Sequence, residues 1–192
     1  IILNGPSATG KTSLQKEFQE LMRIEKDELW IKIGIDNSFD NVLPPITLDN
    51  LDFYRTKNNI RWVENTVDEN NNPVVTLYIG SQGKKVIDGM HDAIVAYAKS
   101  GNNVIVDYIM YDPLWYSELE KKLEGIPHYW IKLDIDLKIL EQREKSRNTS
   151  PIGHARSHYF SIHKNIKYDE VIDCNNKTAK ELAFELKNKI RL

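Results

Sequence analysis

The sequence has little that would tie it to a disulfide framework, a membrane or a nucleic acid. Its 192 residues contain one cysteine, Cys174, so no internal disulfide can form. No apolar run approaches the roughly 20 residues that are needed to span a bilayer. The formal net charge of -2 offers no basic field that would attract nucleic acid or an anionic membrane. We therefore expect no nucleic-acid or membrane partner.

The chain also opens without the pattern of a secretory leader. Its first residues, IILN, read as a strand and not as a basic, then apolar, then small-residue segment. Together with the single cysteine, this favours a cytoplasmic protein. The length fits one sizeable hydrophobic core, and we expect one domain over residues 1–192. The sequence does not indicate the oligomeric state.

Apolar runs and helical periodicity alternate along most of the chain. Strand-like runs occupy residues 1–4, 29–36, 102–108, 129–136 and 170–174. Helical spacing of apolar residues covers residues 14–22, 86–98, 114–123, 137–147 and 179–190. This alternation predicts an α/β fold with about five strands in a mainly parallel sheet, covered by helices on both faces.

Residues 42–83 interrupt that rhythm. They contain two apolar runs, IRWVENTV and VVTLYIG, on either side of the polar stretch DENNNP, which is typical of a hairpin. Long excursions in compact domains are usually functional or mobile. We interpret this one as a substrate cap, and the alternative is a surface hairpin without a ligand.

The segment GPSATGKTS, residues 5–13, has the spacing of a phosphate-binding loop, with a strand before it and a helix after it. Gly5 and Gly10 allow the tight turn that points backbone N–H groups at phosphates. Lys11 is expected to reach the β- and γ-phosphates of ATP, and Thr12 to bind Mg²⁺. The predicted nucleotide-binding residues are Gly5, Ala8, Thr9, Gly10, Lys11, Thr12 and Ser13. The motif predicts the P-loop NTPase fold with ATP and Mg²⁺ as cofactors.

Two acids at the ends of predicted strands are candidates for chemistry beside this loop. Asp107 ends the run VIVD and is the candidate second contact to Mg²⁺, through water. Its alternative is a helix N-cap or a simple acid at a strand end. Asp36 ends the second strand, at the edge where parallel sheets bind ligands. There it can orient an acceptor hydroxyl and take its proton, and its alternative is a capping role alone.

Residues 141–158 form an arginine-rich run, EQREKSRNTSPIGHARSH. Arg143 and Arg147 lie four residues apart, on one face of the predicted helix, and Arg156 follows a break. We expect a lid over residues 143–158, in which Arg143 and Arg147 neutralise charge on a transferred phosphoryl group. The alternative is a solvated helix face with ion pairs of its own. The histidines in this run lack cysteine or acid partners at a zinc-ligand spacing, so we expect no zinc there.

In this order, the segments resemble the chloramphenicol phosphotransferase-like kinases, P-loop enzymes of the shikimate and adenylate kinase type. The matching segments span nearly the whole chain and read IILNGPSATGKTSL, IGIDNSFD, VIVDYIM, LEQREKSR, GHA and HKNIKYDEVID. The resemblance implies transfer of the γ-phosphate of ATP to an alcohol. Asp36 matches the family's base, Lys11 and Thr12 match its loop residues, and Arg143 and Arg147 match its lid arginines.

The sequence departs from the family pattern at two places. Tyr108 stands where a second acid is common, and residues 147–150 read RNTS where the lid commonly reads Arg-Gly-Asp-Arg. We expect a kinase for a small hydroxylated molecule, either chloramphenicol or another antibiotic or metabolite, and hence a role in antibiotic resistance where the acceptor is a drug. The alternatives are a nucleoside or nucleotide kinase and a nucleotide-binding module that has lost catalysis. The near-neutral charge argues against a polynucleotide kinase.

Overall fold

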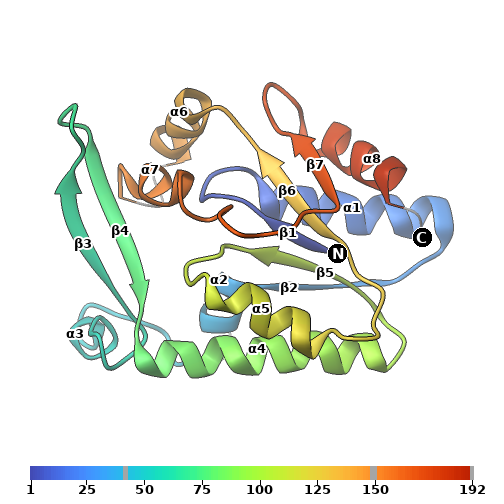
Figure 1. Ribbon diagram of the computed structural model, residues 1–192, viewed down its shortest axis with the longest axis horizontal. Coiled ribbons are helices and arrows are strands. Elements are labelled where there is room, and N and C mark those ends of the chain that lie inside the picture. Colours follow the sequence, from blue (N-terminus) through green and yellow to red (C-terminus); the bar gives the residue numbers. More distant parts are fainter. Residues whose placement is uncertain (41–42, 148–150, 191–192) are drawn as a thin grey trace.

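Helices and strands alternate along most of the chain (Figure 1). The computed structural model describes residues 1–40, 43–147 and 151–190. Five strands form one parallel sheet in the order β2-β5-β1-β6-β7. Their bounds are β1 Ile2–Asn4, β2 Trp30–Gly34, β5 Asn103–Tyr108, β6 Trp130–Asp134 and β7 Glu170–Asp173. The predicted α/β fold with a five-stranded parallel sheet is confirmed.

Helices cover both faces of this sheet, because successive strand residues point to opposite sides. Ile2, Val104 and Val106 face one side, where they pack with α4 (Ser81–Lys99) and α5 (Leu114–Lys122). Leu3 and Ile105 face the other side, which is covered by three helices: α1 (Lys11–Lys26), α6 (Leu137–Arg147) and α8 (Ala179–Lys189). The three inner strands, β5, β1 and β6, are mostly buried on both faces, and such strands read as continuous apolar runs in the sequence.

The carboxyl ends of the parallel strands share one edge of the sheet, and ligands of such sheets gather there. β1 lies between β5 and β6, so the glycine-rich loop that follows it sits in the middle of this edge. The short helix α2 (Ile35–Asp40) follows β2 at the same edge. The topology thus brings the loop, the end of β5 and the start of α2 together.

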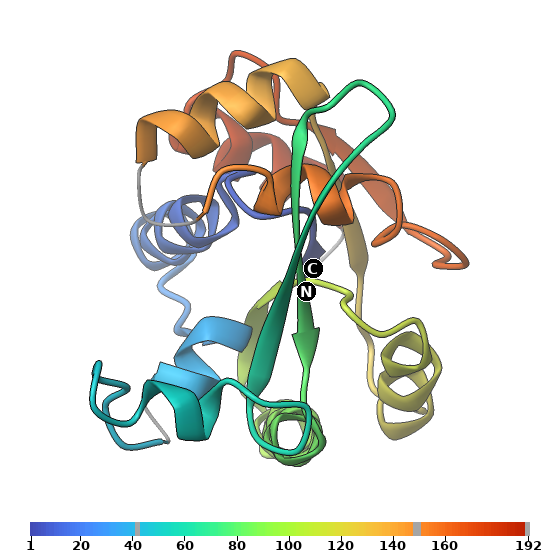
Figure 2. The ribbon, with the colours of Figure 1, turned by 90° about the vertical axis from the view of Figure 1, so that its left-hand side faces the viewer.

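A separate antiparallel hairpin, β3 (Arg61–Val67) and β4 (Pro73–Ile79), stands opposite this edge. Figure 2 shows it in front of the sheet, running from the end where α3 (Leu51–Tyr54) and α4 lie, past α7 (His154–Tyr159), to the level of α6. The backbone N–H of Leu77 in β4 donates to the ring of His158 in α7, at 3.3 Å. The hairpin predicted from the stretch DENNNP is present, and it is fixed to α7 along one strand.

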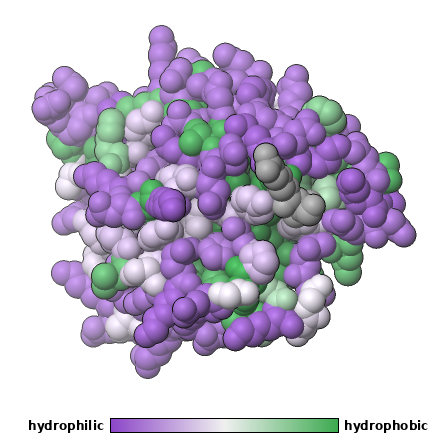
Figure 3. Space-filling view, turned by 45° about the vertical axis from the view of Figure 1, so that its right-hand side comes forward, coloured by the Kyte–Doolittle hydropathy of each residue, from purple (hydrophilic) through white to green (hydrophobic). Residues whose placement is uncertain are grey.

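The outer surface carries few apolar groups on the face drawn in Figure 3, where hydrophilic side chains predominate and hydrophobic ones lie in small separate groups. Scattered apolar groups of this kind are ordinary on a protein surface. Among the residues that the structure describes, no helix combines the length and the apolar character that a membrane crossing needs.

Candidate active site

The loop between β1 and α1 is shaped to receive an anion. Ala8 and Gly10 have positive φ angles of 65° and 104°, a conformation that glycine adopts freely and other residues rarely. The turn leads into α1, whose first N–H groups have no partner in the helix and carry the positive end of its dipole. A Cβ atom at Gly5 would lie 3.1 Å from the Cβ of Leu133, so the loop follows the sheet closely.

Lys11, the first residue of α1, turns back over this loop. Its Nζ donates to the carbonyl oxygens of Gly5 and Pro6, each at 2.8 Å, and lies 3.8 Å from the carboxylate of Asp107. Burial lowers the pKa of Lys11, and the charge of Asp107 acts in the opposite direction. The ammonium group is therefore held by the loop's own carbonyl groups at the place where phosphate would bind.

Thr12 and Asp107 bring two oxygen ligands together beside the loop. The Thr12 hydroxyl donates to Oδ2 of Asp107 at 2.6 Å. Burial raises the pKa of Asp107, while Lys11 and the hydrogen bond from Thr12 oppose that rise. Hydroxyl and carboxylate oxygens are the ligands that Mg²⁺ prefers, so the pair fits this cation. An N-cap role does not apply to Asp107, because it lies within β5 and α5 begins at Leu114.

Asp36 lies in a different element from the one predicted. The strand expected over residues 29–36 ends at Gly34, and Asp36 belongs to the first turn of α2. Ile35 and Phe39 are both buried and lie four residues apart, which is the spacing of one helix face. That packing turns the chain into a helix after Gly34. Asp36 is consequently exposed at the carboxyl edge of the sheet.

Two arginines of α6 reach toward the loop. The guanidinium of Arg143 donates to the carbonyl oxygen of Thr9 at 3.0 Å and to that of Cys174 at 2.9 Å. Arg147, one turn further on, forms no ion pair with any residue that the structure describes. Arg143 is thus held in place by backbone groups, whereas the charge of Arg147 is available to a ligand.

Arg156 has a different role from these two. It forms ion pairs with Glu141 of α6 and with Asp68 in the turn of the hairpin, at 2.5 Å and 2.7 Å. Those contacts connect α7 to α6 and to the hairpin, so Arg156 stabilises the packing of these elements. The predicted lid spans residues 143–158, of which residues 148–150 lie outside the described part of the chain.

Two pockets adjoin at the carboxyl edge. The first, of about 350 Å³, is lined by the loop residues Ala8, Gly10, Lys11, Thr12 and Ser13 and by Asp36, Asp107, Arg143 and Arg147. The second, of about 330 Å³, reaches the hairpin and is lined on that side by Arg61, Trp62, Val63, Val75 and Leu77. Ser7, Asp36, Ile109 and Arg147 line both pockets. The two pockets therefore share a wall that carries one carboxylate and one guanidinium.

Comparison with known proteins identifies the chain's relatives. Over residues 1–191 the sequence matches the family described as chloramphenicol phosphotransferase-like protein. The chain belongs to this family. A protein of Mycobacterium tuberculosis (strain H37Rv), provisionally named an O-phosphotransferase, is 30% identical over 186 residues, which are 97% of this chain and 79% of the relative. The chain is accordingly a phosphotransferase.

Solved structures of other kinases share the fold of this family member. The adenylylsulfate (APS) kinase CysC of M. tuberculosis, in complex with AMPPNP and APS, aligns with a TM-score of 0.62 at 13% identity and covers 98% of this chain and 95% of its own. Shikimate kinase of Acinetobacter baumannii, in complex with shikimate, aligns with a TM-score of 0.55 at 13% identity, over 99% of this chain and 94% of its own. At such low identity these likenesses establish the P-loop kinase fold.

Most of the residues expected at the nucleotide lie on the first pocket, and two do not. Gly5 and Thr9 belong to the loop but are buried on its side away from the pocket. The Thr9 hydroxyl donates to the carbonyl oxygen of Pro6 at 2.7 Å. Ser7 and Lys16 line the first pocket and were missed. The general loop pattern leaves the residue at position 7 unspecified, so only the folded loop shows that it faces the pocket.

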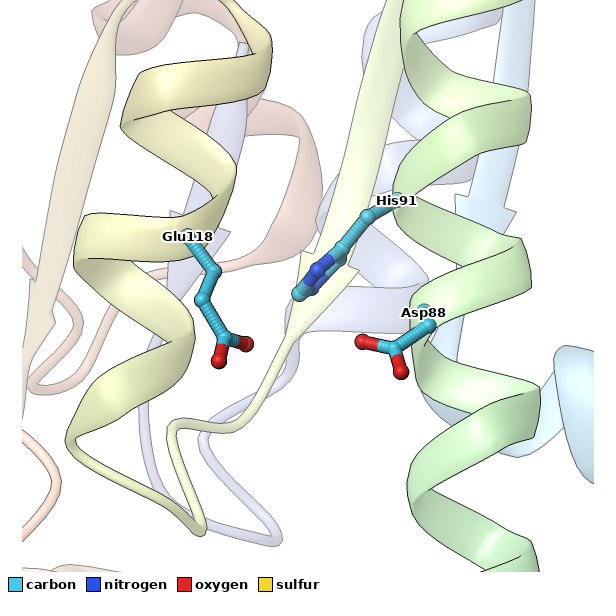
Figure 4. A group of neighbouring side chains, drawn as sticks. All are labelled: Asp88, His91 and Glu118. Atoms are coloured by element: carbon cyan, nitrogen blue, oxygen red, sulfur yellow. The ribbon is translucent and has the colours of Figure 1, made fainter.

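A further group of potential metal ligands lies away from both pockets. Asp88 and His91 of α4 and Glu118 of α5 bring their ligand atoms within 4.8 Å of one another, with the His91 ring between the two carboxylates (Figure 4). Nε2 of His91 is hydrogen-bonded to the hydroxyl of Tyr108 at 2.7 Å, and both rings are buried. This group was not predicted from the sequence, although the spacing of residues 88 and 91 places both on one helix face.

Proposed function

We propose that this phosphotransferase moves the γ-phosphate of ATP to a hydroxyl group of a small molecule. The observation that supports this most strongly is the shared wall of the two pockets. Asp36 and Arg147 line both the pocket at the glycine loop and the pocket at the hairpin. A nucleotide in the first pocket and an acceptor in the second would meet at these two side chains.

Different residues of the chain have different roles in this transfer. Backbone N–H groups of the loop and Lys11 bind the phosphates, and Arg147 supplies positive charge where the phosphoryl group crosses between the pockets. Asp36 accepts a hydrogen bond from the acceptor hydroxyl, orients its oxygen and takes its proton as transfer proceeds. Most of the acceleration comes from positioning and charge, as in phosphoryl transfer generally.

The pair of Thr12 and Asp107 would hold Mg²⁺ beside the phosphates. The cation, when bound, adds positive charge against the phosphate oxygens. Thr12 would contact the cation directly and Asp107 through water, because Mg²⁺ usually keeps several waters. In this proposal the hydrogen bond between the two side chains keeps both oxygens in position.

The experiment that tests the proposal is the substitution Asp36→Asn, which keeps the shape of the side chain and removes the proton acceptor. The purified protein is incubated with Mg·ATP and a panel of alcohols that includes chloramphenicol, nucleosides and polyols, and phosphorylated products are detected by mass. For a phosphorylated panel member we expect kcat to fall roughly 10²- to 10⁴-fold. The affinity for AMPPNP should stay unchanged, because the loop is intact.

A matched control removes an equivalent charge elsewhere. Asp52 of α3 is exposed and lines neither pocket, so Asp52→Asn should leave kcat within about twofold. Undiminished kcat in Asp36→Asn would refute the role of this carboxylate. Nucleotide binding without product from any alcohol of the panel would instead favour a binding module that has lost catalysis.

A further inference from the structure

The pocket at the hairpin carries more positive than negative charge. Among the side chains that the structure describes, three guanidinium groups line it, from Arg55, Arg61 and Arg147, against one carboxylate, that of Asp36. His154 lines it as well, and burial lowers the pKa of that ring, which favours its neutral form. An acceptor that enters this pocket therefore meets a net positive charge.

The arginines of the described part of the chain fall into two groups. Arg23 and Arg156 form ion pairs with carboxylates of the chain. The other four, at positions 55, 61, 143 and 147, form no ion pair with a described residue, and all four line one or both of the adjoining pockets. Arg143 donates to backbone carbonyl groups. A guanidinium that has no ion-pair partner offers a fork of donors that matches a carboxylate, phosphate or sulfate group.

Two of these arginines belong to the acceptor side alone. Arg143 lines only the pocket at the loop, and Arg147 lines both pockets, so both can serve the phosphates of the nucleotide. Arg55 follows α3, and Arg61 begins β3; both line only the pocket at the hairpin. The positive charges of Arg55 and Arg61 therefore face the pocket proposed for the acceptor and not the pocket proposed for the nucleotide.

The rest of this pocket is apolar and aromatic. Trp62 stacks on Tyr78 of the opposite strand, with ring centroids 4.9 Å apart, which fixes its indole in the wall. Val75, Leu77 and Ile109 complete this part of the lining. A pocket with apolar walls and a few charged groups binds a small molecule by its body and orients it by those charges.

We infer that the acceptor of this kinase carries an anionic group besides its hydroxyl, and that Arg55 and Arg61 bind that group while Asp36 receives the hydroxyl. The inference rests on the proposed function, since it names the class of molecule that is phosphorylated. A neutral alcohol such as chloramphenicol would leave both guanidiniums without a partner. Carboxylate, phosphate and sulfate groups share the required chemistry, and the substrate panel separates them.

The first test compares acceptors in pairs that differ in one charge. Each pair holds an anionic alcohol and a neutral relative: shikimate and its methyl ester, gluconate and sorbitol, glucose 6-phosphate and glucose, and N-acetylglucosamine 6-sulfate and N-acetylglucosamine. Transfer from Mg·ATP is followed for every compound and for chloramphenicol. We expect the anionic member of at least one pair to be phosphorylated with a kcat/KM at least tenfold above its partner, and the pair that responds identifies the anion.

The second test changes the arginines. In Arg55→Gln and Arg61→Gln, kcat/KM for the anionic acceptor should fall roughly 10- to 100-fold, mainly through KM, while the affinity for AMPPNP stays unchanged. Activity with a neutral acceptor should change little. Arg23→Gln is the matched control, because Arg23 is exposed on α1 and pairs with Glu20, away from both pockets. Its kcat/KM for the same acceptor should stay within about twofold of the unsubstituted enzyme.

A binding measurement separates this inference from the proposed function. The protein is saturated with Mg·AMPPNP, so that the loop is occupied, and inorganic sulfate is titrated while the fluorescence of the four tryptophans is followed. Trp62 is the one of the four that lines this pocket. Sodium chloride at equal ionic strength is the reference. We expect saturable sulfate binding that weakens at least fivefold in the two arginine variants and is unchanged in Arg23→Gln.

The outcomes are distinct. Saturable, arginine-dependent sulfate binding without transfer to any alcohol would support the anion site and count against the kinase function. Transfer to neutral alcohols that is as efficient as transfer to their anionic partners, and insensitive to both arginine changes, would overturn the anion site and leave the kinase function standing. Absence of both transfer and saturable sulfate binding would overturn the anion site as well.

Discussion

Glu144 is a buried carboxylate on which the position of the second pocket's wall depends. Its side chain lies on α6 with 3% exposure, and its two oxygens accept the backbone N–H groups of Gly153 and Ala155, at 2.8 Å and 2.6 Å. These donors belong to the start of α7, where N–H groups have no partner in the helix. In turn, the N–H of Val75 in β4 donates to the carbonyl oxygen of Gly153 at 3.1 Å. Glu144 thus holds α7, and α7 holds the hairpin.

The substitution Glu144→Gln keeps the volume and exchanges one acceptor oxygen for an NH₂ group, which faces a backbone N–H and cannot accept from it. One buried hydrogen bond to a charged acceptor is lost, and its donor is left unsatisfied. Such a change costs about 2 to 3 kcal/mol in the free energy of unfolding. For a chain of this size, that corresponds to a fall in Tm of roughly 4 to 12 °C.

The assay is urea unfolding of the purified protein, followed by thermal unfolding, with Glu20→Gln as the control. Glu20 is 55% exposed in an ion pair with Arg23, so its loss should lower the free energy of unfolding much less than the loss of Glu144 does. We also expect KM for the acceptor to rise in Glu144→Gln while AMPPNP affinity persists, because the hairpin wall loosens and the loop does not. A free energy of unfolding within about 0.5 kcal/mol of the original protein would refute this reasoning.

Two further predictions concern the loop and the hairpin. Asp107→Asn should raise the Mg²⁺ concentration for half-maximal activity about tenfold, because an outer contact to the cation is weakened, and an unchanged Mg²⁺ dependence would contradict this assignment. Burial lowers the pKa of His158 to about 4, against about 6.5 in the unfolded chain. Between these two values the unfolded state binds more protons than the folded state. The free energy of unfolding therefore falls as the pH drops below 6.5. By pH 5 this histidine alone should cost about 2 kcal/mol relative to pH 7, and His158→Gln, which can still accept from Leu77, should lower the pH dependence by that amount in urea unfolding.

The nucleotide side of the site was predictable because its signals are local. The loop's glycines, Lys11 and Thr12 lie within one short segment, and strand and helix patterns on either side fix their context. Asp107 was expected beside the loop because it ends the apolar run VIVD, and in the structure it lines the loop pocket. Its contact to Mg²⁺ stays a prediction. Asp36 was predicted at the end of the strand instead of in α2, because Ile35 read as the last apolar residue of the strand and its four-residue spacing from Phe39 was not recognised.

The acceptor side was not predictable to the same degree, because its residues meet only through tertiary packing. Arg55 and Arg61 come from an excursion that the sequence showed as a hairpin with no assigned contacts. Glu144 reads in the sequence as one charge among several on a polar helix. It becomes a helix cap only because the chain returns to it nine residues later. Neither the pocket lining by Arg55 and Arg61 nor the capping by Glu144 can be recognised from residue spacing or composition.

The difference between the nucleotide side and the acceptor side of the site affects how the substrate should be sought. The residues that match the family pattern include Asp36 as well as those of the loop and of α6. In the proposed function they act on the phosphates of the nucleotide and on the acceptor hydroxyl, which are the same groups whatever the acceptor is. In the proposed function the rest of the acceptor lies against the hairpin and the residues before it, where Arg55, Arg61 and Trp62 line the pocket. Membership of the chloramphenicol phosphotransferase-like family therefore argues for the reaction and gives little weight to chloramphenicol as the molecule. The charge of the hairpin pocket is the better guide to the acceptor, and anionic alcohols are the first compounds to try.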